Sequence, residues 1–240
     1  MSKAILISSI YLALLFLFTK IFGIKYTEII NNNENIKKGI IYPVGIATIF
    51  LTVYALIFNW LPEVFSFSPT VNQPILWLVP FAIFVGIVAR FLKLNKKAFQ
   101  KNGFILLAIA TLIVGFSEEL LVRGIAVNSL LNSGYSVLLT GIISSFIFGL
   151  LHFINYFNGQ DIKKTTVQVI GTILMGLNFY IIFIITGSLW APIIFHFLFD
   201  FSILAMGNKP KLDNADPVAN IIAISTFVSY VLPVVFLFFL

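Results

Sequence analysis

The chain has 240 residues, of which 60% are hydrophobic and only 10% are charged, whereas about a quarter of the residues are charged in an average soluble domain. This composition excludes a water-soluble globule. The mean hydropathy of +1.04 indicates that lipid is the solvent for most of the surface, where backbone polar groups must be paired internally. We therefore expect an all-α, polytopic membrane protein.

Two further features exclude classes of function. The chain has no cysteine, so a disulfide framework, a thiolate metal site and a cysteine nucleophile are all excluded. The formal net charge of +6 is typical of loop charges that set membrane orientation. We therefore expect no nucleic-acid partner.

Apolar runs between polar or turn-rich breaks predict the elements along the chain. The first, with Lys3 before it, could be mistaken for a signal peptide, but no small-residue cleavage site follows and a retained span is the better interpretation. The eight predicted spans cover about 4–24, 39–61, 73–92, 103–124, 136–158, 165–187, 189–207 and 217–240. We expect a single transmembrane domain over 1–240, with a motif-bearing core at about 107–205.

Basic residues predict the orientation, because short cytoplasmic loops retain Lys and Arg during insertion. Thirteen of the 15 lie in or beside the loops after spans 1, 3, 5 and 7: Lys20, Lys25, Lys37, Lys38, Arg90, Lys93, Lys96, Lys97, Lys101, Lys163, Lys164, Lys209 and Lys211. The three tryptophans, Trp60, Trp77 and Trp190, lie at the opposite face, as an interfacial belt would place them. Both termini are then predicted to lie outside. The high content of Ile, Phe, Lys and Asn indicates a bacterial source, so the membrane is predicted to be a bacterial cell membrane.

Span 4 contains two carboxylates and a guanidinium that are costly inside a membrane and therefore indicate a functional site. Glu119 and Arg123 are four residues apart and share a helix face, which favours an ion pair. Glu118 is rotated by about 100° and points elsewhere. Glu118 is therefore the carboxylate predicted to be free for chemistry.

Both histidines of the chain lie in apolar spans. His152 is in span 5, and His196 in span 7 shares a helix face with Asp200, which could fix the tautomer of its imidazole. At 1.5 Å of rise per residue, Glu118 and His196 lie at similar depths, about 16 Å from the cytoplasmic face. His152 is about 9 Å deep, and reaches their level if span 5 extends to about residue 162.

A carboxylate and a histidine in a dry cavity can share a water, which the base activates against a carbonyl group. A second histidine with Asp200 could then stabilise the oxyanion. The set Glu118, His152 and His196 would also suit a catalytic zinc, but the HExxH metal motif is absent, so we expect no cofactor. A simpler interpretation of any one of these side chains is a hydrogen bond that fixes helix packing.

Three ordered motifs carry a family resemblance. They are Glu-Glu-x-x-x-Arg at Glu118, Glu119 and Arg123, then Phe-x-x-x-His at Phe148 and His152, then His-x-x-x-Asp at His196 and Asp200. Together they resemble the CAAX prenyl endopeptidase and bacteriocin-processing family, often labelled CPBP or Abi. The eukaryotic branch of that family prefers Asn at the position of Asp200, and bacterial members admit Asp.

The resemblance implies an intramembrane endopeptidase of mostly eight helices, described as a glutamic protease more than as a metalloprotease. Its six catalytic-site residues would be Glu118, Glu119, Arg123, His152, His196 and Asp200. Glu118 and His152 would activate water, and the third motif would supply an oxyanion site. The partner would be a peptide or a protein C-terminus at the lipid bilayer, in bacterial peptide maturation or bacteriocin self-immunity.

Two non-enzymatic classes stay open at this point. The same ionisable residues could pass protons or bind an ion in a transporter, although the small size and the lack of a visible inverted repeat disfavour one. The protein could also be an immunity protein that binds its bacteriocin. Cleavage of a peptide by the purified protein would separate these alternatives.

Overall fold

The computed structural model describes residues 2–60, 65, 68–69, 71–207 and 216–240. Over these residues the longer helices are α1 (Ser2–Phe22), α3 (Tyr42–Ile57), α5 (Leu78–Phe91), α6 (Gly103–Glu119), α8 (Val137–Leu151), α10 (Ile162–Thr186), α11 (Trp190–Leu204) and α12 (Pro217–Phe236). Short helical elements join or extend them: η1 (Tyr26–Asn31), α2 (Asn33–Ile36), η2 (Lys37–Ile41), η3 (Pro74–Trp77), η4 (Lys96–Ala98), η5 (Leu120–Val127), α7 (Asn128–Asn132), α9 (Ile154–Phe157) and η6 (Leu237–Phe239). The predicted all-α polytopic membrane fold is confirmed.

Seven helical segments of the described chain are long and apolar enough to cross a membrane: Ile5–Phe22, Asn33–Ile57, Pro74–Phe91, Gly103–Asn132, Val137–Phe157, Ile162–Thr186 and Pro217–Phe239. The predicted span at 189–207 corresponds to α11, which has 15 residues. At 1.5 Å per residue α11 is about 22 Å long, shorter than a hydrocarbon core of about 30 Å. Much of the stretch between the predicted spans 39–61 and 73–92, and all but one residue of the stretch between 189–207 and 217–240, lie outside the described residues.

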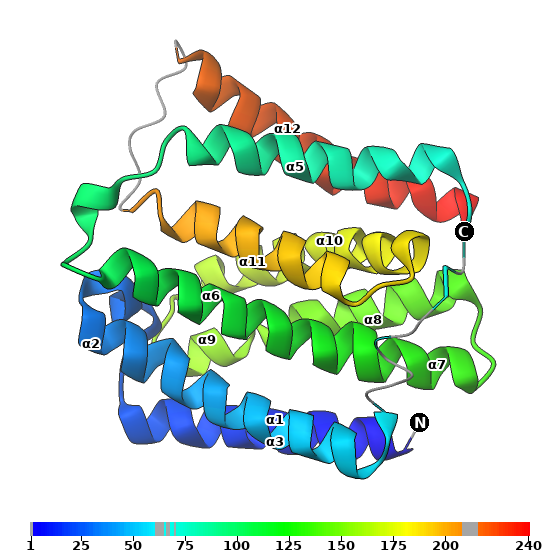
Figure 1. The fold of residues 1–240 in the computed structure, drawn as a ribbon, viewed down its shortest axis with the longest axis horizontal. Coiled ribbons are helices and arrows are strands. Elements are labelled where there is room, and N and C mark those ends of the chain that lie inside the picture. The colour runs from blue at the N-terminus through cyan, green and yellow to red at the C-terminus, as the bar shows by residue number, and fades with distance from the viewer. Residues whose placement is uncertain (1, 61–64, 66–67, 70, 208–215) are drawn as a thin grey trace.

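The helices lie side by side, with α1 and α3 at one edge of the bundle and α5 and α12 at the other (Figure 1). Helix α10 packs against α8, α11 and α12, and α11 packs against α6 and α5. The second half of α10, from Met175 to Ile185, is buried throughout. Asn178 ties α10 to α12, because its side-chain amide donates to the Ser229 carbonyl at 2.7 Å. The third-motif helix α11 is thus enclosed by neighbours that fix its position.

Small residues let the helices that surround α11 approach closely, as is common between membrane helices. A Cβ at Gly149 of α8 would lie 2.9 Å from the Val169 carbonyl oxygen of α10, and one at Gly176 would lie 3.0 Å from the Ser145 Cα. A Cβ at Gly115 of α6 would lie 3.1 Å from the Phe197 backbone nitrogen of α11. Close packing therefore joins α8 to α10 and α6 to α11.

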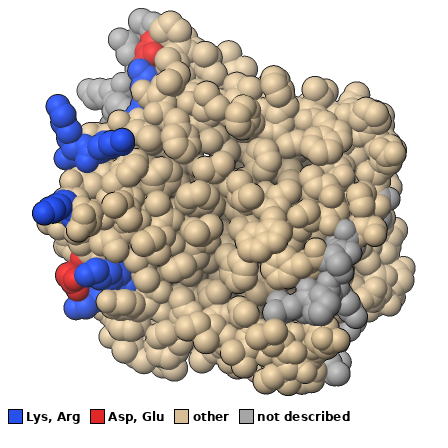
Figure 2. Space-filling model, viewed as in Figure 1, with Lys and Arg blue, Asp and Glu red and all other residues tan. Residues whose placement is uncertain are grey.

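Charged side chains gather at one end of the molecule in the view of Figure 2, the end at which α6 begins. Both chain ends lie at the opposite end (Figure 1). At the charged end Lys93 pairs with Asp216, which also caps α12 by accepting from the Val218 N–H. The Lys93 ammonium holds the pKa of the Asp216 carboxyl below its ordinary value. This segregation agrees with the predicted loop pattern and does not set which end is cytoplasmic.

One of the thirteen basic residues is not a loop charge. Arg90 lies inside α5 and is only 4% exposed. Its guanidinium donates to the Thr226 hydroxyl at 2.7 Å and lies 4.9 Å from the centre of the Phe199 ring. Arg90 is therefore a buried polar link between α5, α11 and α12.

Candidate active site

The first motif spans a change in helix type. Helix α6 ends at Glu119, and the chain continues without a break into η5, a π-helical segment that contains Arg123. Such π-helical turns inside longer helices are rare and are frequent at functional sites. All eight residues of η5 are buried, so the segment holds its side chains inside the bundle.

The structure contains the expected ion pair between Glu119 and Arg123, with 3.0 Å between Oε1 and Nη1, and both side chains are fully buried. The guanidinium also donates from Nη2 to the Gly176 carbonyl of α10 at 2.8 Å. Its Cζ lies 4.5 Å from the centre of the Phe148 ring and 5.5 Å from that of Phe179. Arg123 thus neutralises Glu119 and joins η5 to α8 and α10.

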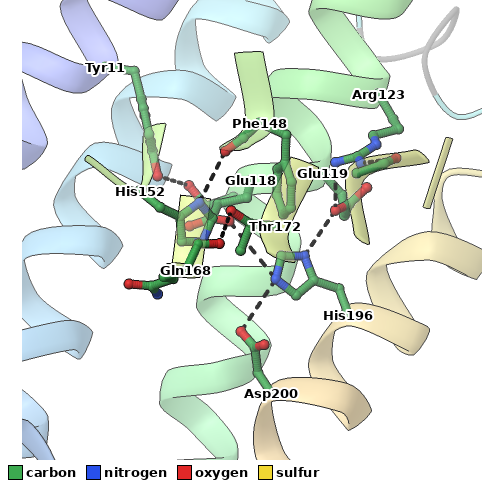
Figure 3. Close-up of polar contacts among 12 residues, drawn as sticks. Tyr11, Glu118, Glu119, Arg123, Phe148, His152, Gln168, Thr172, His196 and Asp200 are labelled. Atoms are coloured by element: carbon green, nitrogen blue, oxygen red, sulfur yellow. Dashed lines mark hydrogen bonds and ion pairs between the residues drawn. The ribbon is translucent and has the colours of Figure 1, made fainter. Parts of the chain in front are cut away.

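His196 of α11 is the centre of the polar cluster. Its Nδ1 lies 2.9 Å from Glu119 Oε1, and its Nε2 lies 3.3 Å from Asp200 Oδ2 and 3.9 Å from Glu118 Oε2. The imidazole stacks on the Phe179 ring with 4.8 Å between centres. Three carboxylates from two helices therefore converge on one imidazole (Figure 3).

Glu118 is the carboxylate with room around it. Its side chain is 18% exposed and that of Asp200 31%, whereas Glu119 is fully buried. Glu118 Oε2 itself is buried and has no hydrogen-bond partner among the described residues. The sequence prediction that Glu118 is free for chemistry fits this setting, but Glu118 does not point away from the cluster, because both glutamates face His196.

His152 lies just after α8 ends, and its Nδ1 is 3.0 Å from the Phe148 carbonyl oxygen. A carbonyl oxygen can only accept, so Nδ1 carries the proton and Nε2 of the neutral ring is left as an acceptor. Span 5 does not run unbroken to residue 162, since α8 is followed by the short α9. The Phe148 ring nevertheless contacts both imidazoles, with its centre 5.2 Å from that of His152 and 5.6 Å from that of His196.

Three contributors to the cluster were not predicted from the sequence. Phe179 stacks on His196, the Gly176 carbonyl accepts from Arg123, and Tyr11 of α1 reaches Ser117, the neighbour of Glu118. Phe179 is one of 27 phenylalanines, and a backbone carbonyl has no sequence signature. Tyr11 is the one of the three with a sequence signal, as a polar-tipped residue in an apolar span.

The zinc alternative would require Glu118, His152 and His196 to converge on one ion. The described residues contain no group of three or more His, Cys, Asp or Glu side chains placed to hold a metal ion. Nδ1 of His196 is engaged by Glu119 and Nδ1 of His152 by a carbonyl, which leaves Nε2 of each ring as the nitrogen that could face an ion. In this arrangement Nε2 of His196 faces Asp200 at 3.3 Å.

An all-α membrane bundle with a buried cluster of carboxylates and imidazoles has the groups that hydrolysis inside a membrane requires. Residues 100–202 match the model of the Rce1-like family, described as type II CAAX prenyl endopeptidase Rce1-like. This match agrees with the family resemblance that the three motifs carry, and at the family level it indicates an intramembrane CAAX-type endopeptidase. No match was found among curated proteins or among solved structures.

Proposed function

We propose that the protein is an intramembrane endopeptidase that cleaves a peptide with water activated by Glu118 and His152. The observation that carries the proposal is the convergence of the first and third motifs on His196, with Glu118, Glu119 and Asp200 all within 3.9 Å of its ring nitrogens. The second motif reaches His196 through the Phe148 ring, with 5.6 Å between ring centres. Hydrolysis uses both kinds of group, a base for the water and donors for the oxyanion. The Rce1-like match to residues 100–202 supports the same class.

In the proposed reaction, Glu118 takes a proton from the water while the water oxygen attacks the peptide carbonyl carbon. The acceptor Nε2 of His152 orients the same water. In this step His196 carries a proton on each ring nitrogen: Nδ1–H faces Glu119, and Nε2–H stabilises the oxyanion beside Asp200. Collapse of the intermediate breaks the C–N bond, and the proton held by Glu118 passes to the leaving amine.

The setting that we propose is a bacterial cell membrane, with both termini outside and with peptide maturation or bacteriocin self-immunity as the role. The composition of the chain supports a bacterial origin, and the charge segregation in Figure 2 supports the topology. A proton relay would use the same buried cluster, but the family match favours hydrolysis.

The test is cleavage of a fluorogenic peptide library by the purified protein in liposomes, comparing wild type with Glu118→Gln. We expect turnover to fall by about 10²- to 10⁴-fold, the range of general-base catalysis. Glu34→Gln is the matched control, because Glu34 is 61% exposed and pairs only with the surface residue Lys37. Proton uptake by the liposomes without any cleavage would instead support a relay.

Metal dependence is tested in the same assay. We expect cleavage to survive prolonged chelation and elemental analysis to find less than one zinc per chain. The reasons are the lack of an HExxH motif in the sequence and, among the described residues, of three His, Asp or Glu side chains placed around one point. One tightly held zinc per chain, lost together with activity in His152→Ala, would contradict this expectation.

A further inference from the structure

A polar residue outside the three motifs reaches the active site from the first helix. Most of α1 faces outward, with Ile5, Leu6 and Leu17 each at least half exposed. Ile7 and Tyr11, one helical turn apart, are the exception, because they are 0% and 1% exposed and belong to the main core. Tyr11 also lies outside residues 100–202, which match the family model.

The contacts of Tyr11 place its phenol against Ser117, the residue that precedes the predicted base. The Ser117 hydroxyl donates to the Tyr11 phenol oxygen at 2.8 Å, and Ser117 directly precedes Glu118 in α6. In Figure 3 the tyrosine side chain extends from α1 toward the region of Glu118 and His152.

The hydrogen-bonding capacities of Tyr11 and Glu118 are complementary, because one has a donor and the other an acceptor to satisfy. A phenol is both a donor and an acceptor, and Tyr11 accepts from Ser117, so its own O–H is available to donate. Glu118 Oε2 is a buried acceptor without a hydrogen-bond partner in the described part of the chain. Most helical Ser and Thr hydroxyls donate within their own helix, as Thr111 does to Leu107. Ser117 instead crosses to α1 and fixes the phenol.

We propose that Tyr11 is a positioning residue of the active site, whose phenol donates through one water to Glu118 and fixes the carboxylate that activates the reacting water. The bridge would satisfy the donor of Tyr11 and the acceptor of Glu118, and a buried polar site with two such partners suits a water. The inference rests on the proposed function for the role of Glu118. It extends the site to α1, beyond the three motifs.

The test compares Tyr11→Phe with Tyr180→Phe. Tyr180 is a matched control, because it is also fully buried and its hydroxyl donates to the Val137 carbonyl at 2.6 Å, away from the motifs. Both variants lose one buried hydroxyl. We expect Tyr11→Phe to lower kcat about 10- to 100-fold with KM unchanged, in the range of a hydrogen bond to a charged group. Tyr180→Phe should keep the wild-type kcat.

A rescue variant separates positioning from packing. Replacement of Tyr11 by p-aminophenylalanine restores a donor at the same place on the ring, and should recover most of the lost kcat. Wild-type kcat in Tyr11→Phe, or an equal loss of kcat in Tyr180→Phe, would overturn the inference while leaving the proposed function intact.

A second readout needs no substrate, so it applies even if the proposed function fails. The infrared band of the Glu118 carboxyl group is identified by its loss in Glu118→Gln. We expect this band to shift in Tyr11→Phe, because a hydrogen bond to the group is removed, and to stay in place in Tyr180→Phe. An unchanged band in Tyr11→Phe would show that Tyr11 does not reach Glu118.

Discussion

Glu119 has two partners on one oxygen, since its Oε1 lies 3.0 Å from Arg123 Nη1 and 2.9 Å from His196 Nδ1. Its other oxygen is buried without a hydrogen bond among the described residues. Glu118 has none of these bonds and is partly exposed. Adjacent carboxylates of the same chemistry therefore have different roles, because Glu119 compensates a buried cation and orients His196, whereas Glu118 stays open to water.

This division predicts that loss of the Glu119 charge acts first on stability. In Glu119→Gln the guanidinium of Arg123 is left buried without its counter-charge, which costs about 3–5 kcal/mol for a buried pair. We expect a lower thermal stability in detergent, whereas Glu118→Gln should keep the wild-type stability and lose turnover. Thermal unfolding and peptide cleavage of both variants measure the difference.

The double variant Glu119→Gln, Arg123→Met is the control for this mechanism. Removal of the orphaned charge should recover stability, because buried ion pairs can be replaced by apolar groups at little cost. Activity should stay low, since His196 still lacks its carboxylate partner. If Glu119→Gln is stable and inactive while Glu118→Gln cleaves normally, the two roles are reversed.

The spacing of residues along a helix was sufficient to predict contacts between side chains of the same helix. Residues four apart share a face, and both Glu119 with Arg123 and His196 with Asp200 are in contact. The same spacing was insufficient to predict contacts between different helices. The angle between Glu118 and Glu119 predicted that they point apart, but the reach of two glutamate side chains and the position of α11 bring both to His196.

At the scale of elements, the contact between α8 and α10 determines where His152 lies. Gly149 of α8 stands three residues before His152, and a Cβ there would lie 2.3 Å from a side-chain carbon of Ile173 and 2.9 Å from the Val169 carbonyl oxygen. The carbonyl belongs to a buried helix and cannot move aside cheaply. Any side chain at 149 must therefore separate the two helices.

We expect Gly149→Ala to lower the stability by about 1–3 kcal/mol, the usual cost of overpacking, and to lower kcat by displacing His152. Gly45→Ala in α3 is the matched control, because a Cβ at Gly45 would meet nothing within 4 Å. Alanine also favours helix over glycine, so the control should be neutral or slightly stabilising. Thermal unfolding and cleavage rates measure both; equal stability of the two variants would contradict the packing argument.

Hydropathy predicted which segments are helical, but it did not predict the length of every helix or the helix type of every segment. Long apolar runs define the spans because lipid requires about 20 apolar residues to cross, and each predicted span has a helical counterpart among the described residues. The 15-residue length of α11 and the π-helical form of η5 were not predicted. Both depend on packing against neighbouring helices, and the order of apolar residues in the sequence does not report that packing.

At the scale of the whole molecule, orientation is the feature that the fold alone leaves open. Lys and Arg gather at the end where α6 begins (Figure 2), and the chain ends lie at the other (Figure 1). Trp77 and Trp190 are each about half exposed, as expected of anchors in an interfacial belt. The retention of basic loops in the cytoplasm then predicts that the charged end lies inside.

Because the chain has no cysteine, single cysteines can report this orientation directly. Position 66, in the predicted outer loop, lies outside the described residues, so Ser133 represents that face, and Lys97 represents the basic one; both are exposed. With an impermeant thiol reagent on intact cells, we expect Ser133→Cys to be labelled and Lys97→Cys to be labelled only after the membrane is permeabilised. The positive charge of the loop around Lys97 is the reason, because translocating it would oppose the insertion rule. Labelling of both variants after permeabilisation is the control for accessibility. Labelling of Lys97→Cys alone on intact cells would show that the orientation is the reverse of the predicted one.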